Sequence, residues 1–559
     1  MGHTLEKYKG CDILDLNPGA CLWSQKLHDF LQPRTHVLLE STPSLYSEFH
    51  DPLLEQPGSK YKLFQGNLIE KDTFDRLFES GILPHQKPLD PQTPEGKQFN
   101  NTLLVTGSLM WDPPATGMGF DSIGKQMLTM ITDSARSNQR YHQAGPVRSL
   151  LWMTEDDFRS AIPRSHYKYS KFTFVMNYLA KNVQVVTPEH QPKGTGGATI
   201  GRTPQYEIQS VIRAMRRGRE SGMELPPHRR ENIHDFADEI ARQNVEQGKD
   251  PEARLSVKEI GEFLDQQVRA GKPAHGIDWE QNIRNSKSMM AVEKDATIIS
   301  VAAKRAAGAK ILTSKWRENS RMIRMTAALV RSGLKKRMSA ERIADQGEAL
   351  FDRECEVIAM EEGPEKEAAK AELENMDAEL DAATRASHHA PYDPASELTE
   401  RISLKSPVPR LQWDDRPYEP LVMQKIEVWP RNRVCLLDSE PYPVPADEDP
   451  GRYFWVFDFV VGLFQNPNMS VTRALDALQP GAASLVDDVA SLRDPKRGGR
   501  WNLDHLKVSM LTNEMISDLY QAYQDWPFKN SNATHSKYFQ WKLSGKTRAR
   551  AQRSGAGKQ

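Results

Sequence analysis

The 559-residue chain has few cysteines, no long apolar run and almost no net charge. Its four cysteines, Cys11, Cys21, Cys355 and Cys435, are scattered and form neither a zinc spacing nor a disulfide framework, so a reducing compartment is expected. No apolar run approaches the ~18 residues that a membrane-spanning helix needs. The formal net charge of −1 gives no whole-chain signal for nucleic-acid binding, so any such signal has to be local. The opening MGHTLEKYKG has no hydrophobic signal core.

What the chain does contain, near its N-terminus, is the pattern of a nucleotide-binding α/β unit. Residues 13–16 are a short apolar run, typical of a strand in a sheet that is covered on both faces. Gly19 supplies the free backbone of a strand-to-helix turn, residues 24–31 have helical spacing, and residues 37–39 predict a second buried strand. Glu40 ends that strand, where an acid can accept hydrogen bonds from both ribose hydroxyls of a cofactor.

This pattern departs from an intact cofactor site at Cys21. A second glycine belongs there, so that the backbone can approach the ligand closely. We expect the Cβ and the sulfur of Cys21 to occupy that space. From these residues alone, a degraded dinucleotide site, a nicotinamide-dependent dehydrogenase and a plain buried βαβ unit all stay open.

The α/β pattern continues over residues 10–204. Apolar runs predict further strands, and helical spacing follows the fourth strand as far as Ser134. Two late apolar runs read as a hairpin or as two more strands. The strands predicted in this part, after the first two, are 61–64, 103–105, 149–153, 172–179 and 183–186.

Residues 205–405 have a different character and predict a charged helical insertion, partly disordered. Within it, residues 303–342 are locally basic and residues 361–383 are acidic and rich in alanine. The basic helix face could contact nucleic acid, and a solvated face is the alternative. Apolar sequence then resumes, so residues 406–450 are expected to return to the α/β domain, with a strand-like pattern at 425–430.

Residues 451–545 predict a small all-α domain, and residues 546–559 a basic tail. The chain has no acid after Asp525, but it has eight lysines and arginines there, with aromatic residues interleaved among the first of them. Aromatic rings that stack on bases and cations that pair with phosphates suit single-stranded nucleic acid. A packed last helix followed by a disordered tail is the alternative. The candidate nucleic-acid residues are Trp526, Phe528, Lys542, Lys546, Arg548 and Arg550.

Seven stretches of sequence carry a family resemblance. They are DILDLNPGA (12–20), LLESTPSLYSEF (38–49), GNL (66–68), VTGSLMW (105–111), LLWM (150–153), VWP (428–430) and LTNEMISDLYQAYQDWPFK (511–529). Their order resembles the ribosomal RNA adenine dimethyltransferases, which use S-adenosylmethionine, and more closely the fungal mitochondrial transcription factor B branch of that family. The resemblance covers about residues 10–190 and 411–545. It implies an α/β, Rossmann-like class I S-adenosylmethionine methyltransferase fold with a C-terminal all-α domain and a long helical insertion.

The resemblance also implies a cofactor-binding set. Asp15 matches the acid that lies near the methionine amino group, and Gly19 the first glycine of the loop. Glu40 matches the ribose-binding acid. Asn67 matches an aspartate that accepts a hydrogen bond from the adenine amino group of the cofactor. An amide in place of that carboxylate weakens a charge-assisted bond by ~1 kcal/mol or more.

The catalytic motif of the family, Gly-Asn-Leu-Pro-aromatic, matches residues 107–111. Ser108, which also borders the cofactor, replaces the asparagine that helps to bind the amino group of the flipped-out target adenine. Trp111 could still stack on that base, but Met110 loosens a loop that proline would fix. A misplacement of ~1 Å can cost ~100-fold in rate. We therefore expect methyl transfer to be residual or absent.

The resemblance implies a partner and a location as well. It implies a mitochondrial matrix protein that binds the single-subunit mitochondrial RNA polymerase and promoter DNA, helps to melt the promoter and holds the exposed strand. Contact with RNA is a further expectation, S-adenosylmethionine is an expected but vestigial cofactor, and no metal or membrane is expected. The alternative is a working rRNA adenine N6-dimethyltransferase.

Overall fold

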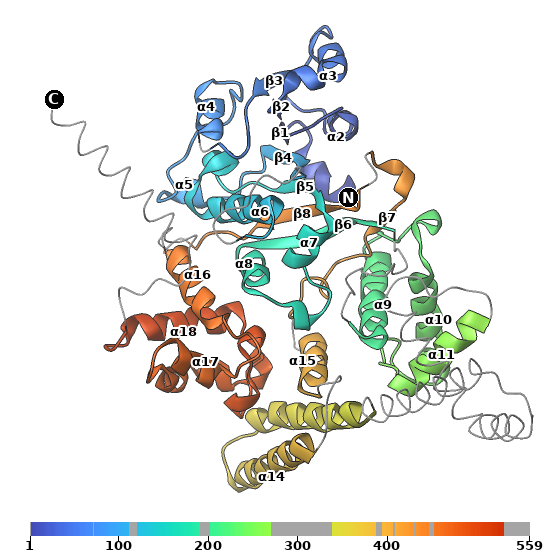
Figure 1. Ribbon diagram of the computed structural model, residues 1–559, viewed down its shortest axis with the longest axis vertical. Coiled ribbons are helices and arrows are strands. Elements are labelled where there is room, and N and C mark those ends of the chain that lie inside the picture. The colour runs from blue at the N-terminus through green and yellow to red at the C-terminus, as the bar shows by residue number, and fades with distance from the viewer. Residues whose placement is uncertain are drawn as a thin grey trace, which may run out of the picture.

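The computed structural model describes residues 2–70, 72–110, 120–189, 202–269, 338–386, 394–405, 409–429, 432–445 and 452–529. Figure 1 shows a central sheet with helices on both faces, a C-terminal helical domain on one side and the helices of the insertion on the other. No helix in the described ranges is long and apolar enough to cross a membrane.

The sheet has eight strands in the order β3-β2-β1-β4-β5-β8-β6-β7. The first five in sequence pair in parallel, whereas β8 runs antiparallel to both β5 and β6. An antiparallel strand between the fifth and sixth strands, after the order 3-2-1-4-5, is the arrangement of the class I methyltransferase fold, so the predicted fold is confirmed. The strands are β1 Asp12–Leu16, β2 Thr35–Glu40, β3 Tyr61–Gln65, β4 Leu103–Ser108, β5 Ser149–Thr154, β6 Ala180–Pro188, β7 Leu421–Met423 and β8 Val434–Pro441.

Helices cover the sheet and build the two additional helical parts. In the α/β domain they are α1 Gly2–Leu5, α2 Leu22–Leu31, α3 Ser47–Leu54, α4 Thr73–Glu79, α5 Pro94–Lys97, α6 Ile123–Ser134, α7 Glu155–Ala161 and α8 Lys171–Leu179. The insertion has α9 Pro204–Glu220, α10 Asn232–Glu246, α11 Val257–Arg269, a helix over residues 338–359, α14 Pro364–Ala386 and α15 Pro394–Lys405. The C-terminal domain has α16 Arg452–Leu463, α17 Val471–Leu478 and α18 Asn513–Asp525, joined by short 3-10 turns.

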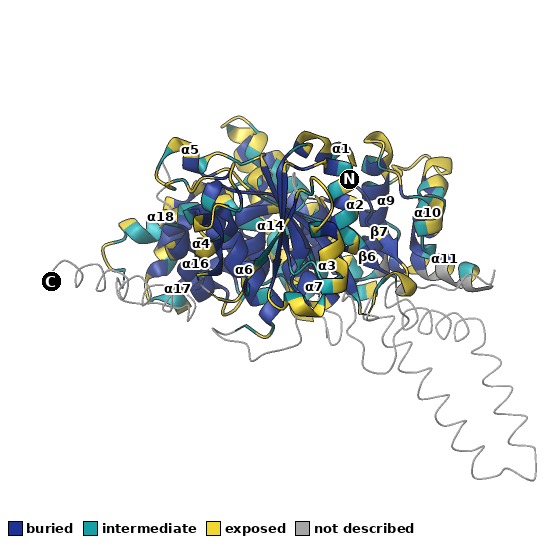
Figure 2. Ribbon diagram, turned by 90° about the horizontal axis from the view of Figure 1, so that it is seen from above, coloured by how far each residue is buried: buried dark blue, intermediate teal, exposed yellow. Residues whose placement is uncertain are grey.

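The two faces of the sheet have separate cores because successive strand residues point to opposite sides. On one face, Ile13 packs with Leu27 and Leu31 of α2. On the other, Leu14 and Leu16 belong to a larger core that continues into the C-terminal domain. Viewed from above, the central strands β1, β2 and β4 are buried almost throughout, and the exposed residues lie mainly on the outer helices and loops (Figure 2).

The described part of the insertion folds around cores of its own. The first is shared by α9, α10 and α11, where Phe236 and Phe263 meet edge to face with ring centroids 5.6 Å apart. A second core joins the helix at 338–359 to α14 through residues such as Leu350 and Leu373. The sheet is then completed by β7 and β8, which follow the insertion in sequence.

Two sequence predictions about strands were wrong. The run at 172–179 is the helix α8, which begins at a capping box formed by Ser170 and Thr173. A short, wholly apolar run does not distinguish a buried strand from a buried helix, and the capping residues decide it here. The strand-like run at 425–430 begins as a 3-10 turn whose Ile426 is 79% exposed. The strand lies further along, at β8.

Candidate functional site

The predicted cofactor residues come together at one edge of the sheet. Strands β3, β2, β1 and β4 are neighbours, and their carboxyl ends lead into Asn67, Glu40, Asn17 and Ser108. The strand order reverses between β1 and β4, and ligands of open α/β sheets bind at such a switch point, outside the carboxyl ends of the strands. The topology therefore retains the place where a nucleotide cofactor would lie.

The loop after β1 is a tight turn that α3 holds in place. Gly19 has φ +56°, and its carbonyl oxygen lies 2.8 Å from His50 Nε2. A side chain at Gly19 would meet only the ring of Tyr46, at 3.8 Å. Tyr46 and His50 were not among the sequence-predicted residues, although both follow Glu40 closely and one lies in the quoted stretch LLESTPSLYSEF.

The side chain of Cys21 lies against the loop, where its Sγ donates a hydrogen bond to the Gly19 carbonyl oxygen at 3.8 Å. It is fully buried and packs with Leu38, Leu53 and Tyr61. The residue itself takes φ +58°, a conformation that is strained for a residue with a Cβ. Burial, and then the nearby Asp15, raise the pKa of the Cys21 thiol to about 12, so it stays protonated at neutral pH. The departure from glycine is therefore accommodated by strained backbone.

Asp15 is buried in the sheet beneath that loop. Neither of its carboxyl oxygens has a hydrogen-bond partner among the described residues, and Oδ2 lies 3.5 Å from Nε2 of the equally buried His36. His36 Nδ1 is in turn 3.1 Å from Nδ1 of His28, and both rings stack with Tyr61. Burial, and then His36, lower the pKa of His28 to about 4, so His28 is neutral at neutral pH. A neutral His28 can donate Nδ1–H to His36, which leaves His36 Nε2–H facing Asp15.

Glu40 is almost fully buried at the end of β2, and one of its oxygens is already occupied. Oε1 accepts hydrogen bonds from the backbone N–H of Ser41 at 2.9 Å and of Thr42 at 3.3 Å, and from the Ser41 hydroxyl at 3.3 Å. These bonds fix the turn after β2. Only the second carboxyl oxygen is left for a ribose, so Glu40 keeps part of the function that the resemblance implies.

Asn67 is turned into its own loop. Its Oδ1 accepts a hydrogen bond from the Ile69 N–H at 3.1 Å, while its carbonyl oxygen accepts one from the Thr73 hydroxyl at 2.7 Å. One of the two lone pairs of that oxygen is therefore used within the loop. The neutral oxygen can accept a hydrogen bond from the adenine amino group only more weakly than the aspartate of the family does.

Ser108, at the end of β4, also bonds locally. Its hydroxyl accepts a hydrogen bond from the Met110 N–H at 3.2 Å, and its carbonyl oxygen accepts one from Asn17 Nδ2 at 3.3 Å. The preceding Gly107 has φ +140°, and a Cβ there would lie 2.1 Å from the Leu16 carbonyl oxygen. This contact brings β4 close against β1. Trp111, the predicted stacking residue, lies outside the described residues.

The residues present do not fit S-adenosylmethionine as a set. Asp15 and Glu40 keep carboxyl oxygens that could accept hydrogen bonds, but Asn67 lacks the charge of the aspartate and already uses one lone pair in its loop, and the Ser108 hydroxyl accepts a bond within its own turn. We therefore derive no methyl-transfer step from this edge.

The second predicted site, the aromatic end of the chain, is partly described. Trp526 and Phe528 follow α18 and meet edge to face with ring centroids 5.7 Å apart. The Gln479 side chain donates to the Phe528 carbonyl and accepts a hydrogen bond from the Tyr523 hydroxyl, which anchors this end on the C-terminal domain. Phe528 is 73% exposed. The four predicted cations, Lys542, Lys546, Arg548 and Arg550, lie outside the described residues.

No protein-family model and no curated protein matches this chain. Among solved structures, it is similar to a dimethyladenosine transferase from Plasmodium falciparum, with 11% sequence identity and a TM-score of 0.22, over 48% of this chain and 86% of that one. The strand order in Figure 1, rather than this likeness, is what shows the methyltransferase fold.

Proposed function

We propose that this protein is a mitochondrial transcription initiation factor built on a degenerate rRNA adenine dimethyltransferase scaffold. It binds the mitochondrial RNA polymerase and promoter DNA, and it stabilises the melted strand. The fold supplies the scaffold. The bases of the melted strand stack on the aromatic end of the chain, and the basic residues that follow pair with its phosphates.

One observation carries this proposal more than any other. Three polar side chains at the cofactor edge, those of Glu40, Asn67 and Ser108, each accept backbone hydrogen bonds within their own turns. An edge whose polar groups are satisfied locally is stable without a ligand. Phe528, in contrast, exposes most of an apolar ring that nothing in the described structure covers. An exposed aromatic residue next to a run of cations is typical of a binding surface for single strands.

Run-off transcription with the cognate polymerase tests the proposal. We expect the protein to increase initiation on duplex promoter templates, and truncation after Ser544 to impair it there while sparing pre-melted templates. Equal activity of the truncated and full chains on both templates would refute a function in promoter melting.

A point variant tests the aromatic contact without removing the tail. We expect Phe528→Ala to weaken binding to single-stranded DNA by roughly 5- to 100-fold, since each base–aromatic stack contributes about 1–3 kcal/mol. Tyr167→Ala is the matched control, because Tyr167 is an exposed aromatic residue of the α/β domain, 65% exposed. An equal loss in both variants, measured by fluorescence anisotropy, would mean that Phe528 makes no specific contact.

The second candidate is an active S-adenosylmethionine-dependent rRNA adenine N6-dimethyltransferase. The observation in its favour is Asp15, whose two carboxyl oxygens are buried without a hydrogen-bond partner in the described structure. An unpaired buried carboxyl is costly, and a ligand amine would relieve that cost. Calorimetry separates the candidates: micromolar binding of S-adenosylmethionine would favour the enzyme, and no heat at millimolar cofactor would exclude it.

A further inference from the structure

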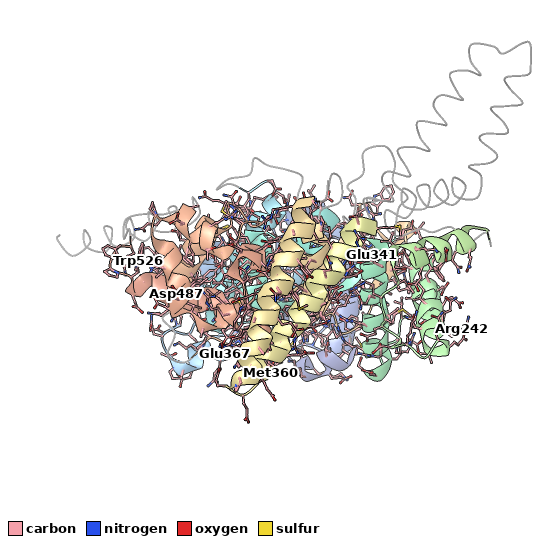
Figure 3. The ribbon with its side chains drawn as sticks, turned by 90° about the horizontal axis from the view of Figure 1, so that it is seen from below. Arg242, Glu341, Met360, Glu367, Asp487 and Trp526 are labelled. Carbon is pink, nitrogen blue, oxygen red and sulfur yellow. The ribbon has the colours of Figure 1, made fainter. Side chains whose placement is uncertain are left out.

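A groove of about 400 Å³ lies where the insertion meets the C-terminal domain. One wall is the helix pair formed by residues 338–359 and α14, and the other consists of α17 and the turns that follow it. Figure 3 shows the helix pair alongside the C-terminal domain, with Met360 and Glu367 near the turn that joins the two helices. The groove is remote from the cofactor edge and exists only because the insertion is present.

The floor of the groove is apolar, and its rim is acidic. Leu350 and Leu373 belong to the core of the helix pair, and the Trp501 ring packs against that core. Around them lie four acids, Glu354, Glu374, Asp377 and Asp504, and one cation, Arg493. An apolar floor with an acidic rim suits the long alkyl stem and charged head of lysine or arginine.

Two of the four acids already have partners. Glu354 forms a buried pair with Arg500, with Nε and Oε2 2.8 Å apart, and Asp377 accepts hydrogen bonds from Asn502 and His505. Glu374 and Asp504, in contrast, have no ion pair with any residue that the structure describes.

Arg493 does not neutralise these two acids. Its guanidinium lies 3.4 Å from Asp487 and donates to the Trp501 carbonyl oxygen at 3.5 Å. The groove therefore keeps a negative potential at its opening. That potential excludes nucleic acid as the occupant and favours a cationic segment. A metal ion is not indicated, because no group of three or more potential ligands occurs in the described ranges.

We propose that, when no nucleic acid is bound, this groove binds the basic C-terminal segment of the same chain, residues 542–559. That segment carries six lysines and arginines and no acid. It begins 13 residues beyond Lys529, the last described residue, so an extended linker spans up to about 45 Å. The path starts from the domain that forms one wall, because α18 packs on the turn that bears Arg493 through a 2.9 Å hydrogen bond from Ser491 to Asp518. A tethered segment also has a high effective concentration, so even weak contacts fill the groove.

Zero-length carbodiimide cross-linking of the full chain tests the contact directly. We expect intramolecular cross-links from Lys542 or Lys546 to Glu374 or Asp504, identified by mass spectrometry, and their loss at high salt because the contact is between exposed charges. A mixture of isotopically labelled and unlabelled protein identifies the source. Cross-links that join the two labels would assign the groove to the tail of a second copy, and cross-links to lysines elsewhere would assign it to another segment. Either result would overturn the proposal.

Limited proteolysis supplies the matched comparison. We expect the double variant Glu374→Gln/Asp504→Asn to be cleaved by trypsin after Arg548 and Arg550 roughly 3- to 10-fold faster than the natural chain, because two exposed charge pairs are lost. The control Glu365→Gln/Glu379→Gln removes two exposed acids from the same helix α14, away from the groove, and should leave the rate unchanged. Equal rates in both double variants would mean that the groove does not hold the tail. The test does not depend on transcription, so it stands or fails separately from the proposed function.

Discussion

The cofactor edge and the junction of the insertion both bury polar side chains, and they differ in how far along the chain the bonding partners lie. At the edge, the backbone N–H groups that donate to the side chains of Glu40, Asn67 and Ser108 lie within two residues of them. At the junction, Arg202 pairs with Asp414, more than two hundred residues away, through bonds of 2.7 and 2.9 Å.

The junction is a network rather than a single pair. Arg202 Nε also lies 2.7 Å from Glu400 of α15, and Glu400 accepts a hydrogen bond from the backbone N–H of His166 at 2.9 Å. Nearby, Arg401 binds the Tyr206 hydroxyl at 3.0 Å and Asp345 at 2.5 Å. The contacts of Glu400 with Arg202 and His166 hold α15 of the insertion against the α/β domain, whereas the bonds of Arg401 lie within the insertion. A polar group bonded within its own turn needs nothing from the rest of the fold, whereas a buried ion requires every partner to be in place.

The largest expected effect is at the junction. Arg202→Met should lower the free energy of unfolding by about 3–5 kcal/mol, because it leaves buried acids without their cation. Arg242→Met is the control, since among the described residues Arg242 pairs only with Glu239 and Glu246, on the exposed face of α10 (Figure 3). We expect no measurable change there. Equal urea midpoints for the two variants would contradict a stabilising network at the junction.

The next effect is a backbone contact at the edge. Gly107→Ala should destabilise the protein by about 3 kcal/mol or more, because the new Cβ would lie 2.1 Å from the Leu16 carbonyl oxygen. Gly58→Ala is the matched control: Gly58 also has a positive φ, of +74°, but open space around it. We expect only about 1 kcal/mol there. If thermal unfolding showed similar losses of stability in Gly107→Ala and Gly58→Ala, the cost would come from the positive φ of both positions rather than from the contact between β1 and β4.

The two regions should also respond to pH in opposite directions. Burial lowers the pKa of His28 from 6.5 to about 4. As the pH falls, His28 is therefore protonated in the unfolded chain before it is protonated in the folded one, and the stability of the protein falls between pH ~6.5 and 4. Burial raises the pKa of Glu400 from 4.5 to about 7, with Arg202 only partly offsetting it. The stabilisation that the protonated Glu400 contributes to the folded state is therefore complete below pH ~4.5 and is lost as the pH rises toward 7.

The variants His28→Gln and Glu400→Gln separate the two pH effects. The first should flatten the acid side of the curve of urea midpoint against pH, and the second should flatten the side between pH 4.5 and 7. The proposed difference between the regions would be wrong if both variants changed the same side.

The smallest expected effect is at the edge side chains. Asn67→Ala should cost about 1 kcal/mol of stability, because it removes one local acceptor from the Ile69 N–H. A second variant, Asn67→Asp, keeps the acceptor for the Ile69 N–H and introduces the carboxylate charge that the family has at this position. It should strengthen any binding of S-adenosylmethionine by about 5-fold or more. A loss of several kcal/mol in Asn67→Ala, seen in urea unfolding, would show that the edge is coupled to the rest of the fold after all.

Much of the sheet was predictable, because its strands are marked by local patterns. Apolar runs of three to five residues, turns with glycine and an acid at a strand end indicated β1 to β5. The hairpin reading of residues 172–179 failed because apolarity alone does not separate a strand from a helix, and β8 was missed because its run, VCLLDSEP, lies beyond a long insertion and has no turn signal of its own.

The cofactor site was predictable in position but not in chemistry. The sequence pattern indicated Glu40 at the end of a strand, and the family resemblance supplied Asp15, Asn67 and Ser108. Parallel strands bring their carboxyl ends to one edge of the sheet. The sequence also identified Cys21 as a departure, but the direction of that side chain depends on a positive φ and on a pocket formed by Leu38 and Tyr61. Backbone conformation of this kind is set by packing and leaves no pattern in the residues themselves.

The amino-acid sequence by itself determined the class of fold, the place of the nucleotide edge and the basic character of the C-terminus, because each depends on local patterns of apolarity, glycine and charge. Only the tertiary structure decided which polar groups bond to their own turns and which reach across the molecule, that Trp501 and Leu373 form the floor of an acidic groove, and that the insertion is fixed by buried ions. Those outcomes depend on contacts between residues far apart in the chain, and the physical reason is that burial, not sequence spacing, sets the cost of leaving a charge unpaired.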